Sequence, residues 1–170
     1  IGLEMEGAVR LAPGQDLAGN ATISRNRFIS FAEFVTLPDF STTEIDRASN
    51  PIAGFPATSG NMRLDYSKKG FSASIMSSLV GTQYVDNGEG ENASGLPQED
   101  LKLEAYMLVD ASISYLFSST GKFAGLKLGL DLNNVLNDEV LTYGNVSFGA
   151  TQFFPAATRH AFFSARYTLK

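Results

Sequence analysis

The stretch Leu126-Lys127-Leu128-Gly129-Leu130-Asp131-Leu132-Asn133 places leucine at every second position and a polar residue or glycine at every other one. A period of two predicts a β-strand, because successive side chains leave the pleated backbone on opposite faces. One face of this strand is aliphatic, and the other carries lysine, aspartate and asparagine. A soluble β-sandwich and a membrane β-barrel with lipid outside and water inside both use such strands. The choice between them rests on the remaining sequence.

Composition excludes several classes of protein. The 170 residues are 44% hydrophobic, and no stretch approaches the ~20 apolar residues of a membrane-spanning helix. The sequence contains no cysteine, which excludes disulfides, thiolate metal sites and cysteine nucleophiles, and its net charge of −5 argues against nucleic acid as a partner. The first residues are acidic and strand-like rather than a signal peptide, so we expect an exported form to begin upstream of Ile1.

Seven segments show the alternating pattern, and the connections between them alternate between short and long. The predicted strands cover 3–12, 17–34, 61–66, 71–85, 107–117, 126–143 and 160–169. Short turns are expected near 13–16, 67–70 and 119–122, and long loops near 35–60, 86–103 and 144–158. In an up-and-down sheet this order places all the long loops at one end, as in outer-membrane barrels with short periplasmic turns and long extracellular loops. The pattern therefore favours an all-β, antiparallel transmembrane barrel segment over a sandwich.

Several motifs resemble those of TonB-dependent outer-membrane receptors, in the same order along the chain. They are Gly19-Asn20-Ala21-Thr22, Asn50 to Pro56, Leu64-Asp65-Tyr66, Val80 to Asn87, the leucine strand continuing through Asn133 to Asp138, and Pro155 to Leu169 with Arg159. The resemblance implies a plugged 22-stranded barrel that imports a ferric siderophore, cobalamin or glycan with energy relayed through TonB. Residues 1–170 are then the C-terminal portion of that barrel, without the plug domain or the earlier strands.

The resemblance also implies the location and the partners. The location is the bacterial outer membrane. The partners are membrane lipid and lipopolysaccharide, the missing plug and strands, TonB through the absent N-terminal part, and an unknown small-molecule or glycan substrate. No cofactor, metal or catalytic set is expected, because the single histidine, His160, has no recognisable partner and no G-x-S-x-G elbow occurs. A small passive outer-membrane channel and a soluble secreted β-sandwich binding module remain the alternatives.

Charged residues of the loops and of the polar strand faces are the candidate binding residues. Loop residues expected to meet substrate are Asp39, Glu44, Asp46, Asp86, Glu89 and Glu91. Residues expected to line the barrel lumen are Glu4, Glu6, Arg10, Arg63, Asp65, Lys127, Asp131 and Arg166. An ordinary solvated loop and an ordinary solvated sheet face explain the same residues, and the acidic loop lacks the ligand pattern of an EF-hand.

Two further groups of residues carry hypotheses. Arg25 and Arg27 continue the apolar phase of the predicted strand 17–34, where they contact either lipopolysaccharide phosphates or water. In the related receptors the closing strand ends on an aromatic residue that the assembly machinery reads. Here Phe163, Tyr167 and Leu169 are the candidates for that signal, although Lys170 follows and Ser164 replaces the usual glycine.

Overall fold

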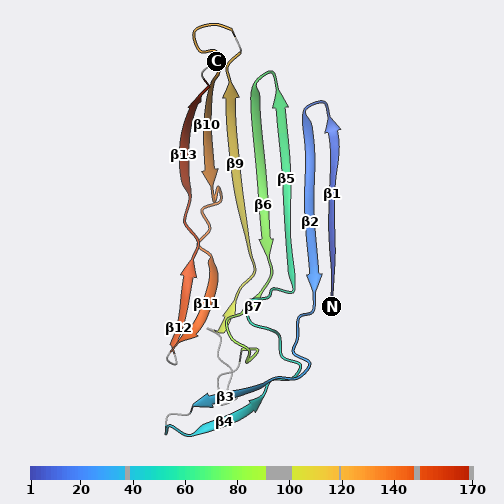
Figure 1. The fold of residues 1–170 in the computed structure, drawn as a ribbon, viewed down its shortest axis with the longest axis vertical. Helices are drawn as coiled ribbons and strands as arrows, with labels where there is room; N and C mark the ends of the chain where they lie inside the picture. Colours follow the sequence, from blue (N-terminus) through green and yellow to red (C-terminus); the bar gives the residue numbers. More distant parts are fainter. Residues whose placement is uncertain (37–38, 91–100, 119, 148–149, 169–170) are drawn as a thin grey trace.

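The chain folds into β-strands connected by turns and loops (Figure 1). The computed structural model describes residues 1–36, 39–90, 101–118, 120–147 and 150–168. No helix found within those ranges has the length and apolarity to cross a membrane.

Seven long strands form one antiparallel sheet in which sequence neighbours are also spatial neighbours. Along the sheet these are β1 (Gly2–Ala12), β2 (Gln15–Ser24), β5 (Thr58–Lys68), β6 (Phe71–Val80), β9 (Tyr106–Leu116), β10 (Leu126–Asn133) and β13 (His160–Tyr167). β1 and β13 are the edge strands, so the sheet is open and not closed into a barrel. The predicted all-β, up-and-down arrangement of seven strands is confirmed.

Each of the three long loops contains a two-stranded hairpin. The hairpins are β3 (Ala32–Thr36) with β4 (Thr42–Asp46), β7 (Gln83–Tyr84) with β8 (Lys102–Leu103), and β11 (Leu141–Ser147) with β12 (Ala150–Pro155). All three lie at the end of the sheet opposite the short connections, as the alternation of loop lengths predicted (Figure 1).

Three of the predicted strands are too long. The segment 17–34 leaves the sheet after Ser24, 71–85 leaves it after Val80, and 126–143 leaves it after Asn133. The backbone leaves the ladder in a different way at each end: Arg27 forms an isolated bridge with Pro51, the Gly81 N–H makes one further bond in the β5–β6 register to the carbonyl of Thr58, and Asn134 adopts a left-handed φ of 49°. The apolar alternation continues past each end because the loop hairpins have a period of two as well.

The turn between β1 and β2 lies so close to the neighbouring strand β5 that it requires a glycine. Pro13 and Gly14 occupy its centre, and Gly14 has a φ of 80°. A Cβ at Gly14 would lie 2.1 Å from the carbonyl oxygen of Ser67 near the end of β5, and the Ser67 N–H donates to the Gly14 carbonyl at 2.7 Å. Glycine is therefore required by both the backbone angle and the space.

Register separates an apolar face of the sheet from a polar one. Across the strands, Val9 lies opposite Leu17, Leu17 opposite Leu64, and Leu64 opposite Ile75; at the other side, Leu130 lies between Ile113 and Phe163. Many of these apolar side chains are exposed, Phe163 to 72%. No second sheet packs on this face among the described residues. Buried apolar side chains within the described ranges gather instead in the loops, at Val85, Leu101 and Leu103.

Candidate functional site

The polar face of the sheet holds all eight residues that were predicted to line a lumen. Register places Arg10, Asp16, Asp65, Ser74, Ser112 and Asp131 in one row across six strands. Arg10 pairs with Asp16 at 3.0 Å, and Arg63 pairs with Asp65 at 2.8 Å. Exposed pairs of this kind contribute only about 0–1 kcal/mol, so their role is to set the charge pattern of the face rather than its stability.

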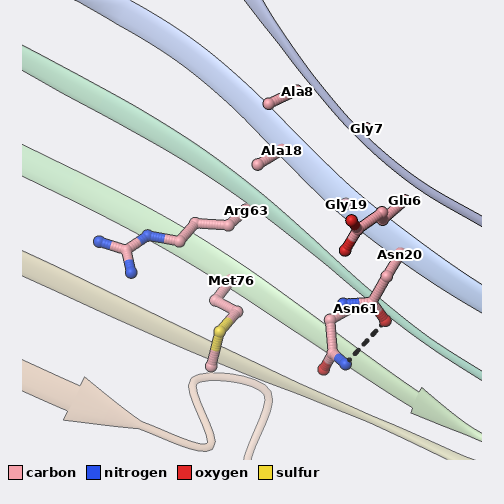
Figure 2. Close-up of a pocket in the computed structure, with 9 residues that line it drawn as sticks. All are labelled: Glu6, Gly7, Ala8, Ala18, Gly19, Asn20, Asn61, Arg63 and Met76. Atoms are coloured by element: carbon pink, nitrogen blue, oxygen red, sulfur yellow. Dashed lines mark hydrogen bonds between the residues drawn. The ribbon is translucent and has the colours of Figure 1, made fainter.

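A shallow groove crosses the polar face over β1, β2, β5 and β6 (Figure 2). Glycine and alanine open its floor, and Glu6, Asn20 and Asn61 stand at one side of it. The amide nitrogen of Asn61 donates to Asn20 Oδ1 at 3.3 Å, and the Ser78 hydroxyl donates to Asn61 Oδ1 at 2.7 Å. The face therefore presents a connected row of hydrogen-bonding groups, with the Arg63 side chain extending away from that row.

Backbone hydrogen bonds join the two segments at the base of the β3–β4 hairpin. We call these segments, residues 26–31 and 47–54, the hairpin stem. The Phe28 N–H donates to the Asn50 carbonyl at 3.0 Å, the Ser49 N–H to the Phe28 carbonyl at 2.9 Å, and the Arg47 N–H to the Phe31 carbonyl at 2.8 Å. Inside the stem, the buried Arg47 guanidinium pairs with Glu33 at 2.9 Å. Phe28 and Phe31 stack with ring centroids 4.6 Å apart.

The segment 83–89 contacts this stem from the next loop. Arg27 pairs with Glu89 at 3.0 Å and also donates to the Ser49 carbonyl. The Asn50 amide donates to the Asn87 carbonyl at 2.8 Å, and the Ala53 N–H donates to Asn87 Oδ1 at 3.1 Å. Both sides of the stem are thus bonded to one short segment.

The same segment contacts the third loop at its other end. Val85 packs with Leu101, Leu103 and the partly buried Phe153 of β12. The side-chain amide of Gln83 donates to the Thr142 carbonyl in β11 at 3.2 Å. Three loops that are separate in the sequence therefore share one set of contacts.

The predicted substrate-contact residues fall into two groups. Glu44 and Asp46 are exposed on β4, on the same hairpin face as Phe34, whose exposure is 70%. The Asp39 carboxylate is also exposed, and hydrogen bonds from the hydroxyl and N–H of Ser41 lower its pKa below the ordinary value. These three carboxylates are accessible to a ligand.

Of the other candidates, the two within the described residues each have a partner in the protein, although Glu89 is itself exposed. Glu89 is committed to Arg27, and Asp86 Oδ1 accepts the Gly88 N–H at 3.0 Å, which closes a local turn. Glu91 lies outside the described residues.

Both arginines lie beyond the last residue of β2, which corrects the strand on which their prediction rested, although the Arg25 backbone still exchanges hydrogen bonds with Ile1 in the register of β1 and β2. The Arg25 side chain is exposed just beyond β2, and its backbone N–H donates to the Ile1 carbonyl at 2.8 Å. Arg27 is engaged by the hairpin stem and Glu89, an arrangement that depends on a residue 62 positions away. On β13, Phe163 and Tyr167 lie on the apolar face opposite Leu130 and Leu126, and Leu169 is beyond the described residues.

Sequence reasoning missed the role of Asn134. Asn134 is buried, with 3% of its surface exposed. Its side-chain amide donates to the carbonyls of Asp138 and Ala157 at 2.8 and 3.1 Å, and its Oδ1 accepts the Asp138 N–H. Its own N–H donates to Asp110 Oδ1 at 2.8 Å. The asparagine-rich motif that resembled a family signature was the available signal, and its function here is to join the end of β10 to the start of β13.

Known structures share this architecture at low sequence identity. The ferric yersiniabactin uptake receptor FyuA from Yersinia pestis is 14% identical over 98% of this chain and 23% of its own, with a TM-score of 0.67. The ferripyoverdine receptor of the outer membrane of Pseudomonas aeruginosa is 19% identical over 96% of this chain and 19% of its own, with a TM-score of 0.61. The copper transporter OprC is 11% identical over 98% and 23%, with a TM-score of 0.62.

The chain spans about a fifth of the length of these neighbours, and no curated protein sequence matches it. The family described as TonB dependent receptor-like, beta-barrel matches residues 2–135, which is most of the chain. That family and the structural neighbours are transport receptors rather than enzymes. The chain therefore belongs to the TonB-dependent receptor β-barrel family.

Proposed function

We propose that this chain is the C-terminal portion of the barrel of an outer-membrane receptor that imports a scarce nutrient, energised through TonB. The observation that carries the proposal is the continuous apolar face of the seven-stranded sheet, backed by a polar face and joined to loops at one end only. Lipid covers such a face in a barrel, and a water-filled or plugged lumen covers the other. The family match supports the same conclusion.

In this proposal the polar row on the sheet faces the plug, and the outer face of the β3–β4 hairpin meets the cargo first. Glu44 and Asp46 flank the exposed Phe34 there, so the surface combines an apolar ring with hydrogen-bond acceptors. The structural neighbours include a ferric citrate transporter, receptors for ferric yersiniabactin and ferripyoverdine, and a copper transporter. A ferric siderophore, cobalamin or a glycan is the cargo class we propose for this receptor.

Nutrient uptake in the source bacterium tests the proposal. Cells lacking the gene for the full-length receptor are compared with wild-type cells and with cells lacking TonB, using labelled ferric siderophores, cobalamin and glycans. We expect the receptor deletion to abolish uptake of one nutrient, and the loss of TonB to abolish it equally. Uptake that needs the receptor but survives without TonB would indicate a passive channel instead. A receptor deletion that changes the uptake of no nutrient would reject both transport functions.

Location is tested separately with an antibody to the loop peptide 86–95. A heat-modifiable outer-membrane band several times larger than 18.3 kDa is the expected result. A soluble band at 18.3 kDa contradicts the membrane assignment.

Arg25 is the residue that we propose for lipopolysaccharide contact, because its side chain is exposed beside the end of β2. The guanidinium suits a phosphate group, whereas Arg27 is already paired with Glu89. Arg25→Ala in the full receptor should lower the amount of lipopolysaccharide that co-purifies with it. Unchanged retention would leave Arg25 in contact with water only.

A further inference from the structure

Two of the motifs that the sequence shares with the receptor family meet in space. Asn50 to Pro56 lies in the first long loop and Val80 to Asn87 begins the second, yet hydrogen bonds join them at Asn50, Ala53 and Gly54. The third of these bonds runs from the Gly54 N–H to the Tyr84 carbonyl at 2.9 Å. One of the three bonds joins two backbone groups, and the other two join the Asn50 side-chain amide and Asn87 Oδ1 to backbone groups of the other motif. The contact therefore depends on the Asn87 side chain as well as on the course of the two backbones.

On its opposite side, the segment 83–87 packs so closely against β11 that no side chain larger than that of glycine fits at Gly144. A Cβ built at Gly144 would lie 2.5 Å from Val85 Cγ1 and 3.1 Å from Phe153 Cδ1. Val85 and its neighbours Leu101 and Leu103 are the buried apolar residues of the described part of the chain. Glycine at 144 thus allows the second and third loops to pack without a gap.

We propose that residues 83–87 are a positioning element that holds the β3–β4 hairpin and the β11–β12 hairpin as one rigid body. In this arrangement Asn87 and Gly144 act through the loops they fix, and neither contacts the cargo. The effect on cargo binding rests on the proposed function, because the hairpin carries Glu44 and Asp46. The coupling between loops does not rest on it.

Spin-label distances in the full-length receptor test the coupling directly. Labels are attached through Thr42→Cys on β4 and Ala150→Cys on β12, both exposed positions in a chain that contains no cysteine. We expect one narrow distance distribution in the receptor with native residues at 87 and 144. Gly144→Ala should broaden it, because the new methyl group pushes Val85 and its segment away. The matched control is Gly7→Ala, where an added Cβ meets no atom within 4 Å.

Amide hydrogen exchange shows whether a substitution at Gly144 loosens the first loop or only the residues around it. In Gly144→Ala, exchange at residues 50–54 should rise about fivefold, the effect of losing about one hydrogen bond, although the substitution lies in another loop. Asn87→Ala should raise exchange at Ala53, and Asn87→Asp should restore it, because Oδ1 still accepts that N–H. A heat-modifiable band shows for each variant that the barrel is folded.

Two results would overturn the proposal. One is a broad distance distribution before any substitution at 87 or 144. The other is an exchange increase in Gly144→Ala that stays within 83–85 and 141–153. Neither readout requires transport, so a failure of the proposed function and a failure of this coupling are distinguishable.

Discussion

At the scale of single residues, the loss of a buried polar group with several hydrogen-bond partners should lower the free energy of unfolding most. Asn134 combines a left-handed φ of 49°, which asparagine tolerates better than most residues, with three hydrogen bonds from its side chain. A buried donor or acceptor left without a partner costs about 1–3 kcal/mol. Asn137 is the contrasting case: its φ is also positive, but it is exposed and its side chain accepts one bond, from the Arg159 N–H.

We expect Asn134→Ala to destabilise the full-length receptor by about 2–4 kcal/mol, because two carbonyls and one N–H lose their partner and the backbone angle becomes strained. Asn137→Ala brings the same backbone strain but loses only one exposed hydrogen bond, so it should cost about 1–2 kcal/mol less than Asn134→Ala. The measurement is the denaturant concentration at which the heat-modifiable form disappears. Equal midpoints for the two variants would show that the buried amide network of Asn134 is not a major stabilising feature.

At the scale of elements, neighbouring residues of β10 face different environments. Leu130 lies on the apolar face between Ile113 and Phe163, and Asp131 lies on the polar face between Ser112 and Phe162. Phe162 shows that the polar face accepts an aromatic ring, exposed to 59% there. The two faces of one strand therefore have different surroundings, apolar at Leu130 and mixed at Asp131, although both residues lie between the same neighbours, β9 and β13.

The same substitution at these two neighbours tests the membrane orientation. Leu130→Arg should cost about 2–4 kcal/mol, the typical penalty for arginine on the lipid face near the bilayer midplane, and should reduce the assembled receptor in the outer membrane. Asp131→Arg should leave the assembled amount close to the wild-type level. The yield of heat-modifiable receptor measures both. Equal tolerance of the two arginines would argue against lipid contact at Leu130.

At the scale of the whole molecule, the chain buries little apolar surface by itself. The buried apolar side chains of the described residues are Val85, Leu101 and Leu103, whereas most large apolar residues of the sheet are exposed. Soluble domains rarely expose contiguous apolar patches above a few hundred Å². The edge strands β1 and β13 also leave backbone groups without a ladder partner on one side.

The 170-residue chain produced alone should therefore aggregate in buffer and disperse only in detergent or lipid. Sedimentation of the purified chain with and without detergent measures this, and far-ultraviolet circular dichroism in detergent checks that strands persist. A monodisperse monomer in plain buffer would contradict the assignment of the apolar face to lipid.

The sequence by itself determined the strands, their order and the two faces. Leu126 to Asn133 illustrates why: alternation is a local property of the pleat, and short connections pair each strand with its sequence neighbour. The segregation of Arg63, Asp65 and Asp131 on one face follows from the same period. Family membership was also readable, since the motifs keep their order.

Only the tertiary structure decided where the strands stop and what the loop charges do. Local sequence makes Arg27 equally suitable for lipid phosphate, water or a carboxylate, and the choice of Glu89 follows from how the second long loop folds back on the first. Asn87 and Gly144 carry no periodic signal either. Their partners Asn50 and Val85 lie tens of residues away in the sequence. These contacts form because the order of strands in the sheet brings the long loops to the same end of the molecule.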